Sequence, residues 1–216
     1  MTSSPSTHAR IGRWNERFAR REETRDFTPA APLAAAIAGV PPGTALDIAC
    51  GAGRHAIFLA ERGWRVIAVD GSRVGIETML AEAGTRECRG GIEAHVVDLE
   101  SEPAAFPIEP DRYDLIADFY FLHRPMFAAI RSGVRPGGLF VAALHVPSPD
   151  GHRGHGFTLA PGELERMVHG WGWHIVHARE EVPAVPGDHG TAELVARRPR
   201  VTVVRAAACR SYPAES

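Results

Sequence analysis

The sequence predicts an α/β protein whose doubly wound, mostly parallel sheet has seven strands and ends in an antiparallel edge hairpin. Two observations support this fold class. Short apolar segments alternate with helical segments along most of the 216 residues, and such alternation implies right-handed crossovers between parallel strands covered on both faces. The first apolar segment also runs into the glycine turn Gly51-Ala52-Gly53 and then a helix, an order of elements typical of doubly wound folds that bind ligands.

Proline and glycine mark the boundaries of the predicted elements. Pro41-Pro42-Gly43 ends a short helix over 33–37, and the apolar run that starts at residue 44 forms the first strand. Arg135-Pro136-Gly137-Gly138 is a predicted turn before the fifth strand. The last two strands, joined by residues 183–190, are expected to form the antiparallel hairpin. The later strands are predicted at 65–70, 92–97, 113–117, 137–145, 173–179 and 192–197, and the later helices at 54–62, 73–83, 125–132 and 161–170.

The overall composition is that of an ordinary globular protein. The hydrophobic fraction is 44% and the charged fraction 23%, as in soluble domains. A formal net charge of -2 gives no basic surplus, so we expect no nucleic-acid partner. Cys50, Cys88 and Cys209 have no paired spacing, which favours a reducing compartment. No apolar run approaches the roughly 18 residues of a membrane span, and the N-terminus lacks a signal-like apolar core. We therefore expect a cytoplasmic protein without a membrane partner.

The predicted domain organisation has three parts. Residues 1–30 form an N-terminal tail and helix, residues 31–198 the ligand-binding domain, and residues 199–216 a C-terminal tail. In the charged segment 10–26, Trp14 and Phe18 lie four residues apart on one helical face. Two interpretations stay open for this helix: a surface helix held to the body by two aromatic rings, or a lid over the ligand cleft. The chain is expected to be a monomer or a homodimer.

Three acidic residues lie at or near the ends of successive predicted strands. Asp47 lies in the first strand, Asp70 ends the second and Asp98 ends the third. In an open parallel sheet, ligands bind at the carboxyl ends of the strands, and an acid about 20 residues after the glycine loop commonly accepts ribose hydroxyls. Each acid taken alone is typical of a helix cap or turn. Three acids together with the glycine loop favour a bound nucleoside.

A nicotinamide dinucleotide is the competing ligand. The run from Gly51 to Ala56 satisfies the loose pattern G-x-G-x-x-G/A. However, Asp47 lies four residues before the first glycine, where dinucleotide folds have plain apolar strand. A carboxylate there disfavours a pyrophosphate and favours a cationic ligand, and Asp98 suits an adenine amino group.

These motifs resemble those of class I S-adenosylmethionine-dependent methyltransferases. The resemblance rests on the run Leu46 to Gly53, on Val69-Asp70, and on Val97-Asp98-Leu99, and it extends over about residues 40–198. Four segments narrow it to the tellurite-resistance (TehB-type) branch: residues 51–54, 96–99, 156–164 and 192–197. The resemblance implies a Rossmann-like methyltransferase fold and S-adenosyl-L-methionine as the cofactor.

The resemblance also implies roles for single residues. Gly51 and Gly53 would back onto the amino-acid part of the cofactor, with Asp47 near its ammonium group. Asp70 would hold the ribose hydroxyls, Asp98 would accept from the adenine amino group, and the backbone N–H of Leu99 would reach a ring nitrogen. The predicted cofactor-binding set is completed by Ala49, Arg54, Gly71 and Phe119.

The turn after the fourth strand and two histidines supply the candidates for catalysis. Tyr120 or Phe119 would face the sulfonium, which an aromatic ring favours by about 1 kcal/mol, unless these rings simply pack under the following helix. His145 and His189 are candidate bases or anion contacts, the alternative being solvated loop histidines. His152 and His155 lack a third ligand nearby, so we expect no metal.

The predicted function is methyl transfer from S-adenosylmethionine to a small molecule. The absence of an obvious base–nucleophile dyad favours a readily ionised acceptor such as a thiol or a chalcogen oxyanion. The Asn/Asp-Pro-Pro-Tyr/Phe signature of amino-nitrogen methyltransferases is incomplete at residues 118–121, which lack the prolines. A nicotinamide-dependent oxidoreductase and a non-catalytic S-adenosylmethionine-binding module are the alternatives.

Overall fold

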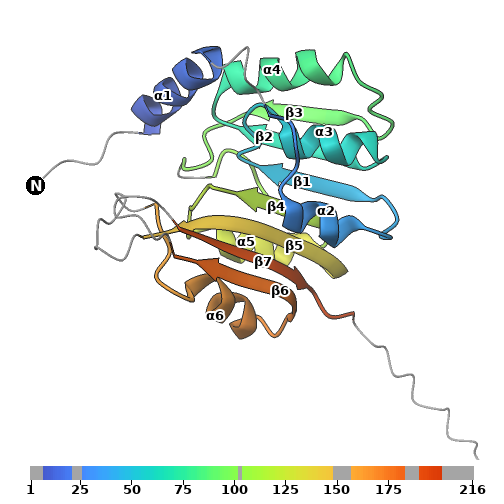
Figure 1. Ribbon diagram of the computed structural model, residues 1–216, viewed down its shortest axis with the longest axis vertical. Coiled ribbons are helices and arrows are strands. Elements are labelled where there is room, and N and C mark those ends of the chain that lie inside the picture. The colour runs from blue at the N-terminus through green and yellow to red at the C-terminus, as the bar shows by residue number, and fades with distance from the viewer. Residues whose placement is uncertain (1–6, 21–25, 102–103, 148–156, 183–189, 201–216) are drawn as a thin grey trace, which may run out of the picture.

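The computed structural model describes residues 7–20, 26–101, 104–147, 157–182 and 190–200. Its seven strands are β1 (Thr44–Ile48), β2 (Arg65–Asp70), β3 (Ile92–Val96), β4 (Tyr113–Phe119), β5 (Val134–Val146), β6 (His174–Glu181) and β7 (Gly190–Arg197). They form one sheet in the order β3-β2-β1-β4-β5-β7-β6, which Figure 1 shows from top to bottom. The first five strands in this order are parallel, and β7 is antiparallel to both β5 and β6. The predicted fold class is confirmed.

The helices are α1 (Thr7–Arg20), α2 (Ala31–Ile37), α3 (Arg54–Glu61), α4 (Arg73–Ala83), α5 (Met126–Gly133) and α6 (Glu163–Gly170). Apolar side chains of α2, α3 and α4 pack in one core with Ala45, Ala68 and Leu115 of the sheet. Those of α5 and α6 pack in a second core with Leu46 and Ile48. Because successive side chains of a strand point to opposite faces, the buried strands carry near-continuous apolar runs.

Two of the differences between the observed and the predicted strand boundaries have a cause in strand pairing. β4 continues two residues beyond the predicted end at Ala117, because Asp118 and Phe119 pair with two alanines of β5. β5 begins at Val134, three residues before the predicted start of this strand and just before the predicted turn, because Val134 pairs with Tyr113 at the start of β4. The proline and glycines that follow appear as an irregularity in this ladder rather than as a separate turn. The pairing with β4 extends both strands.

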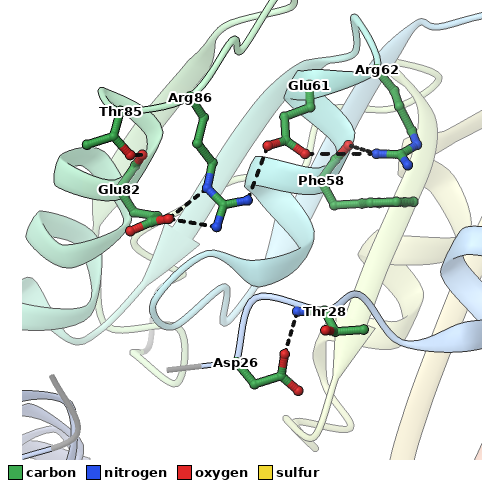
Figure 2. A network of polar contacts seen from close by, with 8 residues as sticks. All are labelled: Asp26, Thr28, Phe58, Glu61, Arg62, Glu82, Thr85 and Arg86. Atoms are coloured by element: carbon green, nitrogen blue, oxygen red, sulfur yellow. Dashed lines mark hydrogen bonds and ion pairs between the residues drawn. The ribbon is translucent and has the colours of Figure 1, made fainter. Parts of the chain in front are cut away.

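A polar network joins the outer surfaces of α3 and α4. Figure 2 shows Arg86 between Glu82 and Glu61; its Nε donates to Glu82 Oε1 (2.7 Å) and its Nη1 to Glu61 Oε1 (3.2 Å). Arg62 extends the network by donating to the carbonyl of Phe58 (3.2 Å) while its guanidinium lies over the Phe58 ring. The network fixes the relative position of the two helices whose N-termini lie at the glycine loop and after Asp70.

Candidate functional site

The site lies where β1 and β4 end side by side at the centre of the sheet. The chain leaves β1 toward β2 and leaves β4 toward β5, so the strand order reverses here, which is where open α/β sheets bind ligands. The residues that follow the two strands both have left-handed backbone conformations, Ala49 with φ 51° and Tyr120 with φ 64°. Such conformations are strained for residues with a Cβ, and they cluster at functional sites.

The glycine loop is connected to the end of β2 by Asp70. One carboxylate oxygen of Asp70 accepts from the backbone N–H of Gly51 (2.8 Å), and the other accepts from that of Ser72 (2.6 Å). Burial raises the pKa of this carboxyl, while the two N–H donors oppose the rise. Asp70 therefore positions the loop, and each oxygen keeps a second lone pair that can accept from a ligand hydroxyl.

The two glycines of the loop are required for different contacts. Gly53 has φ 85°, and a Cβ there would overlap the side chain of Met79 on α4. Gly51 has φ 56°, and a Cβ there would lie 2.9 Å from Phe18 Cζ on α1. The absent side chain of Gly53 thus allows α3 and α4 to pack closely, whereas Gly51 presents bare backbone to α1.

Asp47 is a buried carboxyl with no strong hydrogen-bond donor. Its side chain is 1% exposed, and no described residue donates a well-aligned hydrogen bond to either oxygen. Burial raises its pKa to about 7, although the Ala56 backbone N–H opposes the rise, and the nearby Asp70 adds to it. A carboxyl buried in this way needs a cation or several donors to be ionised at low cost. The ammonium group of S-adenosylmethionine meets that requirement, so this residue fits the predicted cofactor.

Asp118, which we did not predict as a site residue, is a second buried carboxyl. It is 2% exposed, and its Oδ1 has no hydrogen-bond partner among the described residues. Burial first, and then the charge of Asp47, raise its pKa well above the usual range, while the backbone N–H of Phe121 lowers it. An acid at the end of an apolar strand is the same signal that identified Asp70. It was missed because β4 was predicted to end at Ala117.

The adenine side of the predicted site is formed by the turn after β3. Asp98 is partly exposed, and its Oδ1 accepts from the backbone N–H of Glu100 (3.0 Å). Leu99 is buried in the core under α5 and α6. A Cβ on Gly71 would lie 3.0 Å from the side chain of Ile11. Asp98, Leu99 and Gly71 thus follow the ends of β3 and β2, as the motifs predicted.

The predicted acceptor side brings four residues together. The Tyr120 ring, 46% exposed, lies 4.9 Å from the ring of His145 and 5.8 Å from the guanidinium of Arg54. Phe119 is buried and its ring lies 6.5 Å from that of Tyr120. An exposed aromatic ring, an imidazole and a guanidinium offer a surface for a cation or an anion. His189, His152 and His155 lie outside the described residues.

A second histidine, His55 on α3, packs against Phe119 of the site. Its Nε2 accepts from the backbone N–H of Ala30 (3.3 Å), and its ring lies 3.9 Å from that of Phe119. Burial lowers the pKa of His55 to about 3. This imidazole is therefore neutral over the physiological range, and it holds Phe119 in place.

Helix α1 covers the glycine loop and the end of β2. Figure 1 shows α1 beside α4, and Ser72 Oγ donates to Asn15 Oδ1 (2.6 Å) at this contact. Phe18 contacts Gly51 and also Gly75, where a Cβ would lie 3.2 Å from its ring. Arg10 forms an ion pair with Glu100 in the turn after β3. The contacts of α1 therefore extend across the ends of β1, β2 and β3.

Two further findings concern the rest of the molecule. A cavity of about 680 Å³ lies beyond the end of β7, between α5 and the start of β6, where Trp171, Trp173 and Arg198 contribute to its lining. None of the predicted site residues lines it. Across the described residues, we find no helix with the length and apolarity needed to cross a bilayer.

Comparison with curated proteins gives one relative. Hemagglutinin 1 of Eikenella corrodens is 29% identical over 142 residues, which cover 63% of this chain and 46% of the relative. The chain thus spans about half the length of the curated relative it matches.

Solved structures share the fold at low sequence identity. TehB from Haemophilus influenzae has a TM-score of 0.67 at 18% identity, covering 86% of this chain and 67% of its own. The Burkholderia thailandensis 1,6-didemethyltoxoflavin-N1-methyltransferase, with bound S-adenosylhomocysteine, has a TM-score of 0.57 at 20% identity, covering 92% and 93%. The [4+2]-cyclase SpnF has a TM-score of 0.67 at 15% identity, covering 91% and 98%.

The fold of this chain is thus the Rossmann-like fold of S-adenosylmethionine-dependent methyltransferases, as the sequence predicted. A family model agrees with the narrower resemblance. The model for tellurite resistance protein TehB matches residues 18–193, which is most of the sequence and includes every predicted strand except most of the last. The chain belongs to the TehB family.

Proposed function

We propose that this protein binds S-adenosyl-L-methionine and transfers its methyl group to a small-molecule acceptor. The observation that carries the proposal is the Asp47 carboxyl, which is buried beside the glycine loop without a well-aligned donor. A cationic cofactor satisfies such a carboxyl, whereas the pyrophosphate of a nicotinamide dinucleotide is repelled by it.

Each predicted residue has a role consistent with its position. Asp47 holds the ammonium group, Asp70 accepts from the ribose hydroxyls while it positions Gly51, and Asp98 accepts from the adenine amino group. The backbone of Leu99 completes the adenine contacts. Ala49 and Gly71, on the loops after β1 and β2, and Arg54, at the start of α3, border the cofactor, and Gly53 acts through the packing of α3 on α4.

The bound cofactor supplies an activated methyl group on a sulfonium, so the protein's main task is to orient the acceptor and exclude water. The exposed face of Tyr120, supported by Phe119, favours positive charge at this position. His145 lies beside Tyr120 and accepts a proton from an acceptor that arrives protonated. We propose His189 as a further contact for the acceptor.

The proposed acceptor is small and ionises readily, with a thiol or a chalcogen oxyanion as the favoured classes. Support comes from the residues around Tyr120: Arg54 offers a positive charge to an anionic acceptor, and His145 is the one imidazole in contact with that ring among the described residues. A soft, readily ionised nucleophile needs little help from a base. Membership in the TehB family is compatible with this acceptor class.

We further propose that α1 is a lid over the bound cofactor. Phe18 and Asn15 hold it to the glycine loop and to α4, so the cofactor enters and leaves only when these contacts open. Substituting Phe18→Ala should speed cofactor dissociation in stopped-flow measurements. Glu16→Ala, whose side chain on the same helix is 67% exposed, is the control and should leave dissociation unchanged; equal rates for both variants would contradict the lid.

Calorimetric titration with S-adenosylmethionine and with NAD tests the cofactor first. We expect binding of S-adenosylmethionine only, and its loss in Asp47→Asn but not in Glu87→Gln, which neutralises an exposed carboxylate. Formation of S-adenosylhomocysteine is then assayed with thiols, tellurite, selenite, amines and phenols. Tight NAD binding without S-adenosylmethionine binding would favour the oxidoreductase. Cofactor binding without product from any acceptor would favour the non-catalytic module.

A further inference from the structure

Two buried carboxyls flank the end of β1 from opposite sides of the sheet. Asp118 pairs in register with Ile48, and Asp47 pairs with Ala117. Because side chains alternate along a strand, Asp118 points to the face covered by α5 and Asp47 to the face covered by α3. Both are almost fully buried, and three of their four carboxylate oxygens have no hydrogen-bond partner among the described residues.

The charged groups around this pair do not neutralise it. The Asp70 carboxylate, on β2, is a further negative charge near Asp47, and it is satisfied by two backbone N–H groups. Arg54, at the start of α3, is the positive charge whose field reaches Asp47. No described basic residue perturbs Asp118, which is affected by the Asp47 charge and by the backbone N–H of Phe121. With Asp47, Asp70 and Asp118 ionised and Arg54 charged, the site therefore has one more negative charge than an ammonium group alone would balance.

S-adenosylmethionine carries two positive centres, the ammonium nitrogen and the sulfonium sulfur, which three carbon atoms separate. A ligand of this kind lying across the end of β1 can place one positive centre on each side. Asp118 directly precedes Phe119 and Tyr120, the residues proposed to border the methyl group. Asp118 therefore lies on the strand that leads to the proposed reacting end of the ligand, and Asp47 lies on the strand that leads to the glycine loop.

We propose, as an extension of the proposed function, that Asp118 recognises the sulfonium and makes the protein bind S-adenosylmethionine more tightly than S-adenosylhomocysteine. Methyl transfer forms a bond from the acceptor to the methyl carbon and breaks the bond from that carbon to sulfur. The electron pair stays on sulfur, so the product is a neutral thioether. Asp118 then faces no positive charge, and a buried carboxylate in that position must take up a proton or weaken product binding. Asp118 thus favours release of the product.

Calorimetric dissociation constants for the two ligands test this assignment on the full chain. We expect the wild type to bind S-adenosylmethionine at least about tenfold more tightly, because one charge interaction at intermediate dielectric is worth at least that factor. Asp118→Asn should remove this preference by weakening S-adenosylmethionine binding while S-adenosylhomocysteine binding stays within about threefold. Asp47→Asn should weaken both ligands, because both contain the ammonium group.

Asp111→Asn is the matched control. It makes the same substitution just before the start of β4, where Asp111 is exposed and forms an ion pair with Arg198, and it should change neither constant. Sinefungin, which carries an amine in place of the sulfonium, tests the wild type without any substitution and should bind like S-adenosylmethionine. Equal loss of both ligands in Asp118→Asn, or sinefungin binding as weakly as S-adenosylhomocysteine, would overturn the assignment. Binding of neither ligand to the wild type would instead reject the proposed function on which it rests.

Discussion

Replacing Gly53 with alanine tests how the glycine loop is held between α3 and α4. Gly53 has φ 85°, and an added Cβ would overlap the Met79 side chain, which is fully buried. The left-handed conformation costs a residue with a Cβ about 1–2 kcal/mol, and overpacking a buried site costs about 1–3 kcal/mol. Together these costs lower the free energy of unfolding by about 2–5 kcal/mol, which in a chain of this length lowers the melting temperature by roughly 5–15 °C.

Urea unfolding of Gly53→Ala measures this loss, and Gly39→Ala separates its two causes. Gly39 has φ 73° and nothing within 4 Å of an added Cβ, so its replacement should cost only the conformational part. Met79→Ala removes the side chain that the new Cβ would overlap. Gly53→Ala should therefore lower the free energy of unfolding much less in the Met79→Ala background than in the wild type. Equal losses for Gly53→Ala and Gly39→Ala, or no coupling with Met79, would refute the packing role.

Other perturbations test the electrostatics and the strained backbone. Stability of the ligand-free protein should fall as pH rises from 4 to 7, because folded Asp47 keeps its proton up to a pKa of about 7 whereas the unfolded carboxyl loses it near 3.8. In urea titrations, Asp47→Asn should reduce the slope of the free energy of unfolding against pH by up to about 1.4 kcal/mol per pH unit. A slope equal to that of the wild type would contradict the raised pKa of Asp47. Arg86→Met should cost about 1 kcal/mol in thermal unfolding through loss of the polar network, and Arg89→Met, whose side chain is exposed, should cost nothing measurable. Tyr120→Asn should keep the free energy of unfolding within about 1 kcal/mol of the wild type, since Asn tolerates the left-handed region, but it should reduce methyl transfer. Tyr120→Phe keeps the aromatic ring, so equal activity of the two variants would show that the ring has no role in the reaction.

The fold could be predicted because its signals are local. Apolar runs of strand length alternate with helical segments, and β2 and α4 have the predicted bounds. The positions of Asp47, Asp70 and Asp98 also follow from the strand pattern. Carboxyl ends of neighbouring parallel strands meet at one edge of the sheet, so the sequence alone predicts that these acids lie along that edge.

The remainder of the site depends on contacts between distant segments. The end of β4 is set by pairing of Asp118 and Phe119 with β5, and the local pattern of that strand does not contain this information. The need for glycine at residue 53 comes from Met79, and the need at residue 51 comes from Phe18 on α1. These partners are known only once the helices are packed.

Asp70 illustrates how one residue combines both kinds of information. Its position at the end of β2 predicted a contact with the ribose, and the structure adds hydrogen bonds from the backbone N–H groups of Gly51 and Ser72. A substitution such as Asp70→Ala therefore leaves two buried N–H groups without a partner and lowers stability as well as affinity. Loss of cofactor binding in that variant alone would not identify a ribose contact.

The most direct test of the central claim, that an acidic site at the ends of β1, β2 and β4 holds a cationic nucleoside, is a crystal structure of the protein with S-adenosylmethionine. We expect the ammonium nitrogen within hydrogen-bonding distance of Asp47 and the ribose hydroxyls on Asp70. A ligand bound in the cavity lined by Trp171 and Trp173, or with no contact to Asp47, would contradict the claim.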